Sequence, residues 1–124
     1  VVGASDIVGK PVAVMLMRRE ATVISTNKFT DGLPELAANA DVLVAAAGVP
    51  GLVKRNWVKP GAVAIDVGIN RIADPETGRR RTVGDLAFEE VREVAGWVTP
   101  VPGGVGPVTV AALLENVVAS ASGT

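Results

Sequence analysis

The first residues of the chain have the types and spacing of a phosphate-binding turn. Val1 and Val2 are β-branched and lead into a turn that contains Gly3 and Ser5, and Gly9 then opens an apolar segment. A strand, a tight turn and a helix start in this order present backbone N–H groups and the positive end of a helix to an anion. The spacing G-x-S-x-x-x-G differs from the common dinucleotide fingerprint G-x-G-x-x-G, so the turn alone leaves a purely structural role open.

Similar turns follow the other strands that the sequence predicts. In parallel α/β sheets, ligands bind outside the carboxyl ends of the strands, and these ends meet at one edge. Several glycine-bearing turns at that edge indicate a flat, extended ligand that lies close to the backbone. The segments that follow the predicted strands are 3–5, 27–28, 48–50, 68–70 and 102–107.

Alternating strand and helix patterns predict the elements that hold these turns. Continuous apolar runs indicate buried strands at 42–47 and 62–66, and shorter strands are expected at 21–26 and 97–99. Helices are expected at 10–19, 52–58 and 108–121, and a hairpin is expected at 71–83. Two further helices are expected to begin at the N-cap residues Asp31 and Asp85. This order predicts a Rossmann-like, doubly wound α/β fold: a mostly parallel sheet with helices on both faces.

The apolar side chains of these elements are expected to form the core. Leu33, Leu36 and Ala37 recur at helical spacing, and the last helix has a comparable stripe. We expect the methionine pair to be buried and the two tryptophans to pack rather than stack on a base. The methionines are Met15 and Met17, and the tryptophans are Trp57 and Trp97. The stripe of the last helix consists of Val110, Leu113, Leu114, Val117, Val118 and Ala121.

Composition excludes several classes of function. The 124 residues carry a net charge of −1, which gives no basic field for nucleic acid or an anionic membrane. No apolar run reaches the roughly 18 residues needed to span a bilayer, and the absence of cysteine makes a cytoplasmic location the simplest expectation. The chain also has no histidine and no tyrosine, which removes two common proton-transfer side chains. We assign no catalytic residue and no metal site to it.

The start of the chain suggests a longer protein. Val1 is not a start methionine, and two residues are short for the central strand that their position implies. We therefore interpret residues 1–124 as one domain of a longer protein, whose preceding domain is absent from the chain.

Four motifs in order resemble one family closely. They are VGASDIVGKP at 2–11, KPGAVAIDVGINR at 59–71, VGD at 83–85 and TPVPGGVGPVT at 99–109. Together they resemble the cofactor-binding, carboxyl-terminal half of bifunctional methylenetetrahydrofolate dehydrogenase/methenyltetrahydrofolate cyclohydrolase. The resemblance covers essentially the whole chain, and the Pro-Val-Pro-Gly-Gly-Val-Gly-Pro segment is its most specific part.

The resemblance implies a function in one-carbon folate metabolism. Such enzymes oxidise 5,10-methylenetetrahydrofolate with NADP⁺ and hydrolyse the methenyl product to 10-formyltetrahydrofolate. The family's proton-handling lysine and tyrosine belong to the missing domain, so this fragment alone is expected to be inactive, and a homodimer through the present domain is expected. By position, the dinucleotide would contact Gly3, Ala4, Ser5, Ile69 and Thr109, and the folate would border Pro102, Gly103, Gly104, Val105 and Gly106.

Two departures from the family's commoner pattern bear on cofactor choice. Many members have arginine where this chain has Ala4, and His-Ser where it has Asn27-Lys28. A bacterial variant has a basic residue followed by Phe-Thr, which Lys28 and the next two residues match. A cation at the end of the second strand suits the 2′-phosphate of NADP, whereas an acidic residue there suits NAD. We therefore expect NADP rather than NAD, against the alternative that Lys28 is only solvated.

Other interpretations of the sequence stay open. The fold could belong to a non-catalytic dinucleotide-binding or scaffold module. Another Rossmann dehydrogenase of the shikimate type would explain the first turn but not residues 99–109. Asp66 is expected to satisfy loop N–H groups rather than to act in catalysis. The arginines at 79–81 are expected to be a solvated hairpin edge rather than a phosphate site.

Overall fold

A short parallel sheet lies at the centre of the molecule. The computed structural model describes residues 1–123. Strands β1 (Val42–Ala45), β2 (Val63–Asp66) and β5 (Trp97–Val98) pair in the order β1-β2-β5, all parallel. Ala45 and Ala64 at its centre are fully buried, as expected for a sheet that is covered on both faces.

Two further segments extend this sheet beyond β1. Val2 forms parallel bridges to Ala45 on one side and to Thr26 on the other. From one edge of the sheet to the other, the strand segments are therefore Thr26, Val2, β1, β2 and β5. Numbered by their position in the chain, they lie in the order 2-1-3-4-5. This is a doubly wound order with its switch point between Val2 and β1, where a ligand crevice is expected. The Rossmann-like prediction is confirmed.

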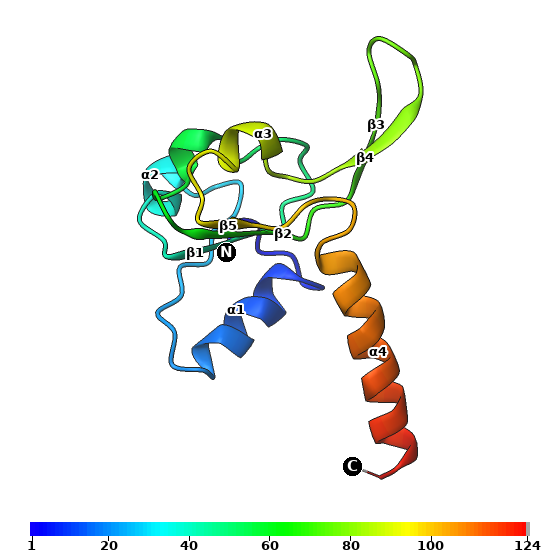
Figure 1. Ribbon diagram of the computed structural model, residues 1–124. Coiled ribbons are helices and arrows are strands. Elements are labelled where there is room, and N and C mark those ends of the chain that lie inside the picture. The colour runs from blue at the N-terminus through cyan, green and yellow to red at the C-terminus, as the bar shows by residue number, and fades with distance from the viewer. Residues whose placement is uncertain (124) are drawn as a thin grey trace.

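Helices flank the sheet on both sides (Figure 1). Helix α1 (Gly9–Met17) lies on one face, and α2 (Leu33–Ala37), the 3₁₀ turn η1 (Arg55–Trp57) and α3 (Phe88–Val91) lie on the other. The antiparallel hairpin of β3 (Asn70–Ala73) and β4 (Arg80–Val83) projects from the carboxyl edge of the sheet. Helix α4 (Val105–Ala121) starts at the same edge and runs away from the sheet.

Several element boundaries differ from the sequence prediction. Residues 21–26 form only the Thr26 bridge, because their other side has no paired strand among the described residues. Helix α2 begins after Gly32, which has a left-handed φ of 64°, and not with an Asp31 cap. Helix α4 begins at Val105, since Pro107 is tolerated in a first turn whose N–H groups have no helical partner.

The core is smaller than the hydropathy pattern predicts. Met15, Met17 and Trp97 are 66%, 51% and 77% exposed, so the expectation that they are buried or packed is wrong. No residue of α4 is buried, and its apolar stripe faces solvent, because the helix leaves the sheet rather than packing on it. Trp57 does pack against the core, as expected. Within residues 1–123, no helix has the length and hydropathy to cross a membrane.

Candidate functional site

The turn after Val2 has a shape that only glycine permits at two positions. Gly3 has a φ of 99°, and a Cβ atom there would overlap the Ala46 carbonyl oxygen and lie 2.7 Å from the Ala47 Cα. A Cβ atom at Gly9 would overlap the Gly3 carbonyl oxygen. The turn therefore folds tightly back on itself and against the segment that follows β1.

This turn leaves a row of backbone donors without protein partners. The Ser5 hydroxyl oxygen accepts the N–H groups of Val8 and Gly9 at 3.3 and 3.1 Å, which satisfies the start of α1. No hydrogen bond within residues 1–123 is donated by the N–H groups of residues 4–7. Consecutive free N–H groups beside a helix start form a concave anion site. The predicted turn thus has the donors that a dinucleotide pyrophosphate requires.

Lys28 lies at the tip of a neighbouring turn. The Asn27 side-chain oxygen accepts the Phe29 N–H at 2.9 Å, and the Asn27 N–H donates to the Thr30 hydroxyl at 3.0 Å. Thr26 fixes this turn beside the first one, because its carbonyl accepts the Gly3 N–H at 3.1 Å. The Lys28 ammonium lies 5.0 Å from the centre of the Phe29 ring and makes no ion pair among the described residues.

Ile69 follows β2 at the same edge of the sheet. Its side chain is 70% exposed, which is unusual for isoleucine next to a buried strand. An apolar side chain in this position can cover one face of a flat ring.

The glycine-rich loop after β5 is joined to the same edge. The Thr99 hydroxyl accepts the Asp66 N–H at 2.8 Å, which ties the start of the loop to the end of β2. Gly104 packs on the Pro100 carbonyl so closely that a Cβ atom would overlap it. The expected folate residues 102–106 therefore lie partly in this loop and partly in the first turn of α4. The Thr109 hydroxyl donates to the Gly106 carbonyl at 2.6 Å, within the helix.

Two buried carboxyl groups lie behind these loops. Asp66 is 3% exposed and accepts the N–H groups of Gly68, Asp85 and Leu86, each at 3.0 Å. Burial raises the pKa of Asp66, against the lowering effect of these three hydrogen bonds, and the neighbouring Asp85 raises it further. The structural role expected for Asp66 is confirmed.

Asp85 has a role that the sequence analysis missed. It does not cap α3, whose N-cap residue is Ala87. It is fully buried and accepts the N–H groups of Ala47 and Gly48 at 2.7 and 3.0 Å. The signal available in the sequence was the Val-Gly-Asp motif, in which the glycine allows the chain to approach Asp66.

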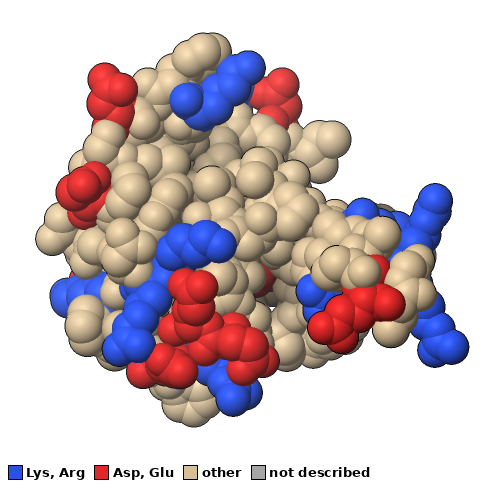
Figure 2. Space-filling view, turned by 90° about the horizontal axis from the view of Figure 1, so that it is seen from above, with Lys and Arg blue, Asp and Glu red and all other residues tan. Residues whose placement is uncertain are grey.

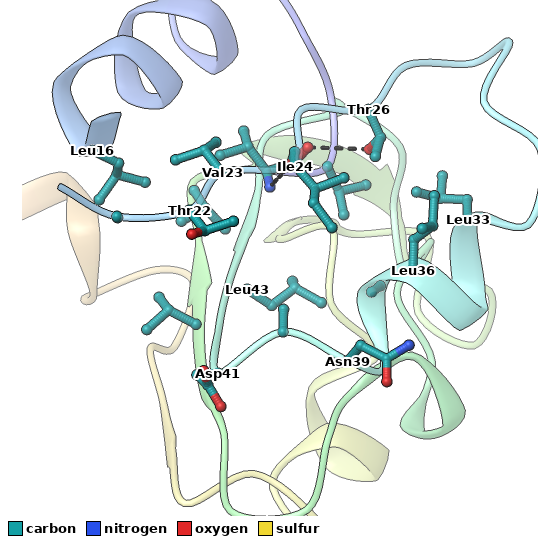
Figure 3. A pocket seen from close by; sticks show the side chains of 17 residues that line it. Leu16, Thr22, Val23, Ile24, Thr26, Leu33, Leu36, Asn39, Asp41 and Leu43 are labelled. Carbon is teal, nitrogen blue, oxygen red and sulfur yellow. Dashed lines mark hydrogen bonds between the residues drawn. The ribbon is translucent and has the colours of Figure 1, made fainter. Parts of the chain in front are cut away.

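A hollow in the described chain lies away from these loops. It measures about 560 Å³ and lies between residues 21–26, α2 and β1 (Figure 3). Its wall is mainly apolar, with Leu16, Ile24, Leu36 and Leu43 among the labelled side chains. None of the residues predicted to bind cofactor or folate lines it. The candidate site is instead formed by the loops at the carboxyl edge of the sheet.

Comparison with known proteins agrees with this arrangement. The family profile described as "Tetrahydrofolate dehydrogenase/cyclohydrolase, NAD(P)-binding domain" matches residues 1–124. The chain belongs to this family. The bifunctional protein FolD of Rhizobium johnstonii is 55% identical over 126 residues, which is 100% of this chain and 42% of that protein. FolD of Parvibaculum lavamentivorans is 54% identical, over 98% of this chain and 41% of its own length.

Solved structures of the tetrahydrofolate dehydrogenase/cyclohydrolase family share the fold. The bifunctional FolD enzyme of Campylobacter jejuni superposes with a TM-score of 0.90 at 47% identity, covering 98% of this chain and 42% of that one. The Trypanosoma brucei enzyme, solved with NADP cofactor and an inhibitor, has a TM-score of 0.85 at 46% identity, over 93% of this chain and 40% of its own. The resemblance inferred from the four motifs is confirmed. The chain spans about two fifths of the length of these relatives.

Proposed function

We propose that this chain is the NADP-binding half of a methylenetetrahydrofolate dehydrogenase/methenyltetrahydrofolate cyclohydrolase. The observation that carries the proposal is the row of free N–H groups at residues 4–7, located at the switch point of a sheet whose family binds NAD(P). The NADP complex of the Trypanosoma brucei relative supports the choice of dinucleotide.

The proposed contacts divide the rim among three parts of the cofactor. Ala4 and Ser5 hold the pyrophosphate through free backbone N–H groups, and Gly3, whose own N–H donates to the Thr26 carbonyl, contributes the tight turn that presents them. Lys28 faces the 2′-phosphate, and its lack of an acidic partner in the described chain leaves its charge available. Ile69 covers the nicotinamide end. The two further parts of the proposed site are Thr109, near the cofactor, and the folate-bordering residues Pro102, Gly103, Gly104, Val105 and Gly106.

In this proposal the chain positions reactants and performs no proton transfer. The bound nicotinamide supplies the hydride acceptor for oxidation of the methylene carbon. The residues of this chain orient that ring and exclude water from one side of it. A preceding domain of the kind that the longer relatives contain would supply the proton-handling groups. The solvent-facing apolar stripe of α4, a helix that starts at this edge of the sheet, supports a complementary domain.

We also propose a homodimer that forms along residues 21–26. On its inner side this segment is held by Val1, whose nitrogen donates to the Ile24 carbonyl at 2.8 Å. In the described structure, residues 22–25 donate no backbone hydrogen bond, so the outer edge is free to pair. Ile24 is 50% exposed beside the apolar hollow of Figure 3. An exposed edge of this kind can pair with the same edge of a second copy around a two-fold axis.

The remaining expectations are a cytoplasmic location and no nucleic-acid partner, and both stay part of the proposal. Figure 2 supports the second, since positive and negative side chains are interspersed over the face that it shows. The arginines at 79–81 are all exposed on the projecting hairpin, as expected. Cell fractionation and a gel-shift titration with duplex DNA and single-stranded RNA test the two expectations.

Titration with nucleotides tests the cofactor proposal. We expect the chain to bind NADP⁺ more tightly than NAD⁺, and Lys28→Met to weaken NADP⁺ by roughly 3- to 10-fold, the effect of about 1 kcal/mol at an exposed ion pair. NAD⁺ affinity should not change, because NAD⁺ has no 2′-phosphate. Isothermal titration calorimetry measures each affinity.

A matched variant and an activity assay complete this test. Lys59→Met removes the same charge beside Asp41, at the opposite end of β1, and should leave both affinities unchanged. With 5,10-methylenetetrahydrofolate the chain alone should reduce no NADP⁺. A wild-type chain that binds neither nucleotide contradicts the cofactor proposal, and an unaltered NADP⁺ preference in Lys28→Met contradicts the role of Lys28. Turnover at the rate of a full-length relative would contradict the division of labour.

A further inference from the structure

Two buried acidic side chains in this molecule have no cationic partner. Asp66 is 3% exposed and Asp85 is fully buried, and neither belongs to an ion pair of the described chain. Burying a carboxyl group is costly unless hydrogen bonds replace its water. Each of the two accepts three hydrogen bonds, and all donors but one are backbone N–H groups.

Asp85 joins the ends of two strands that are distant in sequence. One of its oxygens accepts the N–H groups of Ala47 and Gly48, directly after β1. The other accepts the side-chain amide of Asn70 at 2.9 Å, at the start of β3. A Cβ atom at Gly68 would overlap this second oxygen, so the turn after β2 also lies against Asp85.

Asp66 in turn fixes Asp85. It accepts the backbone N–H groups of Asp85 and Leu86, and a Cβ atom at Gly84 would overlap its carboxyl group. Residues 84–86 are therefore held closely against the end of β2. From this position the Asp85 side chain reaches both outer loops.

Both loops that Asp85 holds lie behind the proposed cofactor contacts. Gly3 packs against Ala46 and Ala47, so residues 46–48 form the support of the phosphate turn. Ile69 lies between Gly68 and Asn70, both of which contact Asp85. One carboxyl group thus sets the separation between the pyrophosphate support and the residue proposed to cover the nicotinamide.

We propose that Asp85 is a positioning residue for the dinucleotide, which holds the 46–48 loop and Asn70 at the separation that the whole cofactor requires. The inference rests on the proposed function, since it concerns how the same rim is organised. A positioning role predicts that the affinity for ligands that reach both loops depends on Asp85, whereas the affinity for ligands confined to the adenosine end does not. A general role in stability would affect both kinds of ligand.

The test compares NADP⁺ with 2′,5′-ADP, which lacks the nicotinamide half. Asp85→Asn replaces one carboxylate oxygen by an NH₂ group, which can only donate. This group would face either the N–H groups of Ala47 and Gly48 or the Asn70 amide, so at least one hydrogen bond is lost. We expect NADP⁺ affinity to fall about 10-fold and 2′,5′-ADP affinity to stay within 2-fold of the wild type, measured by calorimetry on the 124-residue chain. Asp41→Asn is the matched control at an exposed site and should change neither affinity.

A double substitution tests the hydrogen bond itself. In Asp85→Asn/Asn70→Asp the donor and acceptor exchange places, while the residue at 85 keeps one oxygen for the two N–H groups. We expect this variant to recover NADP⁺ affinity to within about 3-fold of the wild type. If Asp85→Asn does not fold, Asn70→Ala removes the same hydrogen bond by changing its half-buried partner. This variant should lower the affinity for NADP⁺ by about 3-fold and leave that for 2′,5′-ADP unchanged.

The outcomes separate this proposal from the preceding one. A wild-type chain without NADP⁺ affinity removes the proposed function, and this inference with it. A wild-type chain that binds NADP⁺, with variants that lose NADP⁺ and 2′,5′-ADP in equal proportion, leaves the cofactor role intact and shows that Asp85 is only structural. Unchanged NADP⁺ affinity in both Asp85→Asn and Asn70→Ala overturns the inference in the same way.

Discussion

At the scale of single residues, Asp41 and Asp66 have pKa values that are shifted in opposite directions. Asp41 is fully exposed, and its hydrogen bond to the Lys59 ammonium at 2.6 Å, with the attraction of that charge, lowers its pKa below 3.8. Asp66 lies in the interior, where burial raises its pKa above 3.8. The ionised form of Asp41 therefore stabilises the folded state, whereas for Asp66 the protonated form does so.

The pKa directions predict the pH dependence of each contribution. A lowered folded-state pKa at Asp41 gives stability that is present above the unfolded pKa and is lost as pH falls through the folded value. The raised pKa of Asp66 gives the reverse, a contribution that is present below the unfolded pKa and is lost as pH rises through the folded value. Carboxyl ¹³C titration by NMR should find Asp41 below 3.8 and Asp66 above it.

Lys59→Met provides the control for this titration. The substitution should return the pKa of Asp41 toward 3.8 and leave that of Asp66 unchanged, because only Asp41 contacts the ammonium. An Asp41 pKa that does not move would contradict the ion pair.

At the scale of elements, α3 and α4 differ in what their apolar residues do. Val91 of α3 is fully buried in the core cluster, whereas Leu114 of α4 is 63% exposed. The spacing of apolar residues alone does not distinguish them, because each belongs to a set of apolar residues at helical spacing. Burial on folding, and not apolar character, determines how much each contributes to stability.

Alanine substitutions in the two helices should differ in cost. Val91→Ala removes two buried carbon atoms and should lower the free energy of unfolding by about 2 kcal/mol. Leu114→Ala should stay within about 0.5 kcal/mol, as at other exposed sites. Urea denaturation of both variants measures the difference. A large cost for Leu114→Ala that disappears on dilution would indicate that α4 is covered by another copy in solution.

At the scale of the whole molecule, the outer edge of the sheet and the α4 stripe are two separate candidates for assembly. The edge at residues 21–26 has free backbone groups and an adjoining hollow, whereas α4 offers only side chains. Backbone pairing fixes a register and a two-fold relation, which favours the edge for the homodimer.

Charge substitutions distinguish these two surfaces. Ile24→Glu introduces a carboxylate at the edge and should raise the dimer dissociation constant at least 10-fold, measured by sedimentation equilibrium. Leu114→Glu introduces the same charge on α4 and should leave the dimer intact. The opposite pattern would assign the dimer to α4, and a wild-type chain that is monomeric at all concentrations would remove the dimer proposal.

How much of this was readable from the sequence depended on the range of the interaction. The glycine turn at residues 3–9, the buried strands β1 and β2 and the hairpin follow from local patterns, and the structure has them in the predicted order. The segment 21–26 was misread because β-branched residues form a strand only where a partner is present, and here only Thr26 pairs. The sequence predicts capping roles for Asp31 and Asp85 that the structure does not have. Asp85 instead accepts hydrogen bonds from the distant Ala47 and Gly48, and the N-cap position of α2 is occupied by Gly32.

The sequence by itself determined the family, the doubly wound order and the edge at which a ligand can bind, since motifs, glycine turns and apolar runs act over a few neighbouring residues. Only the tertiary structure decided what Asp85 does, because its donors at Ala47 and Gly48 lie 38 and 37 residues away along the chain. It also decided which apolar side chains are core and which stay in solvent. Apolar character gives a preference for burial, but the surface that a helix meets decides whether burial occurs.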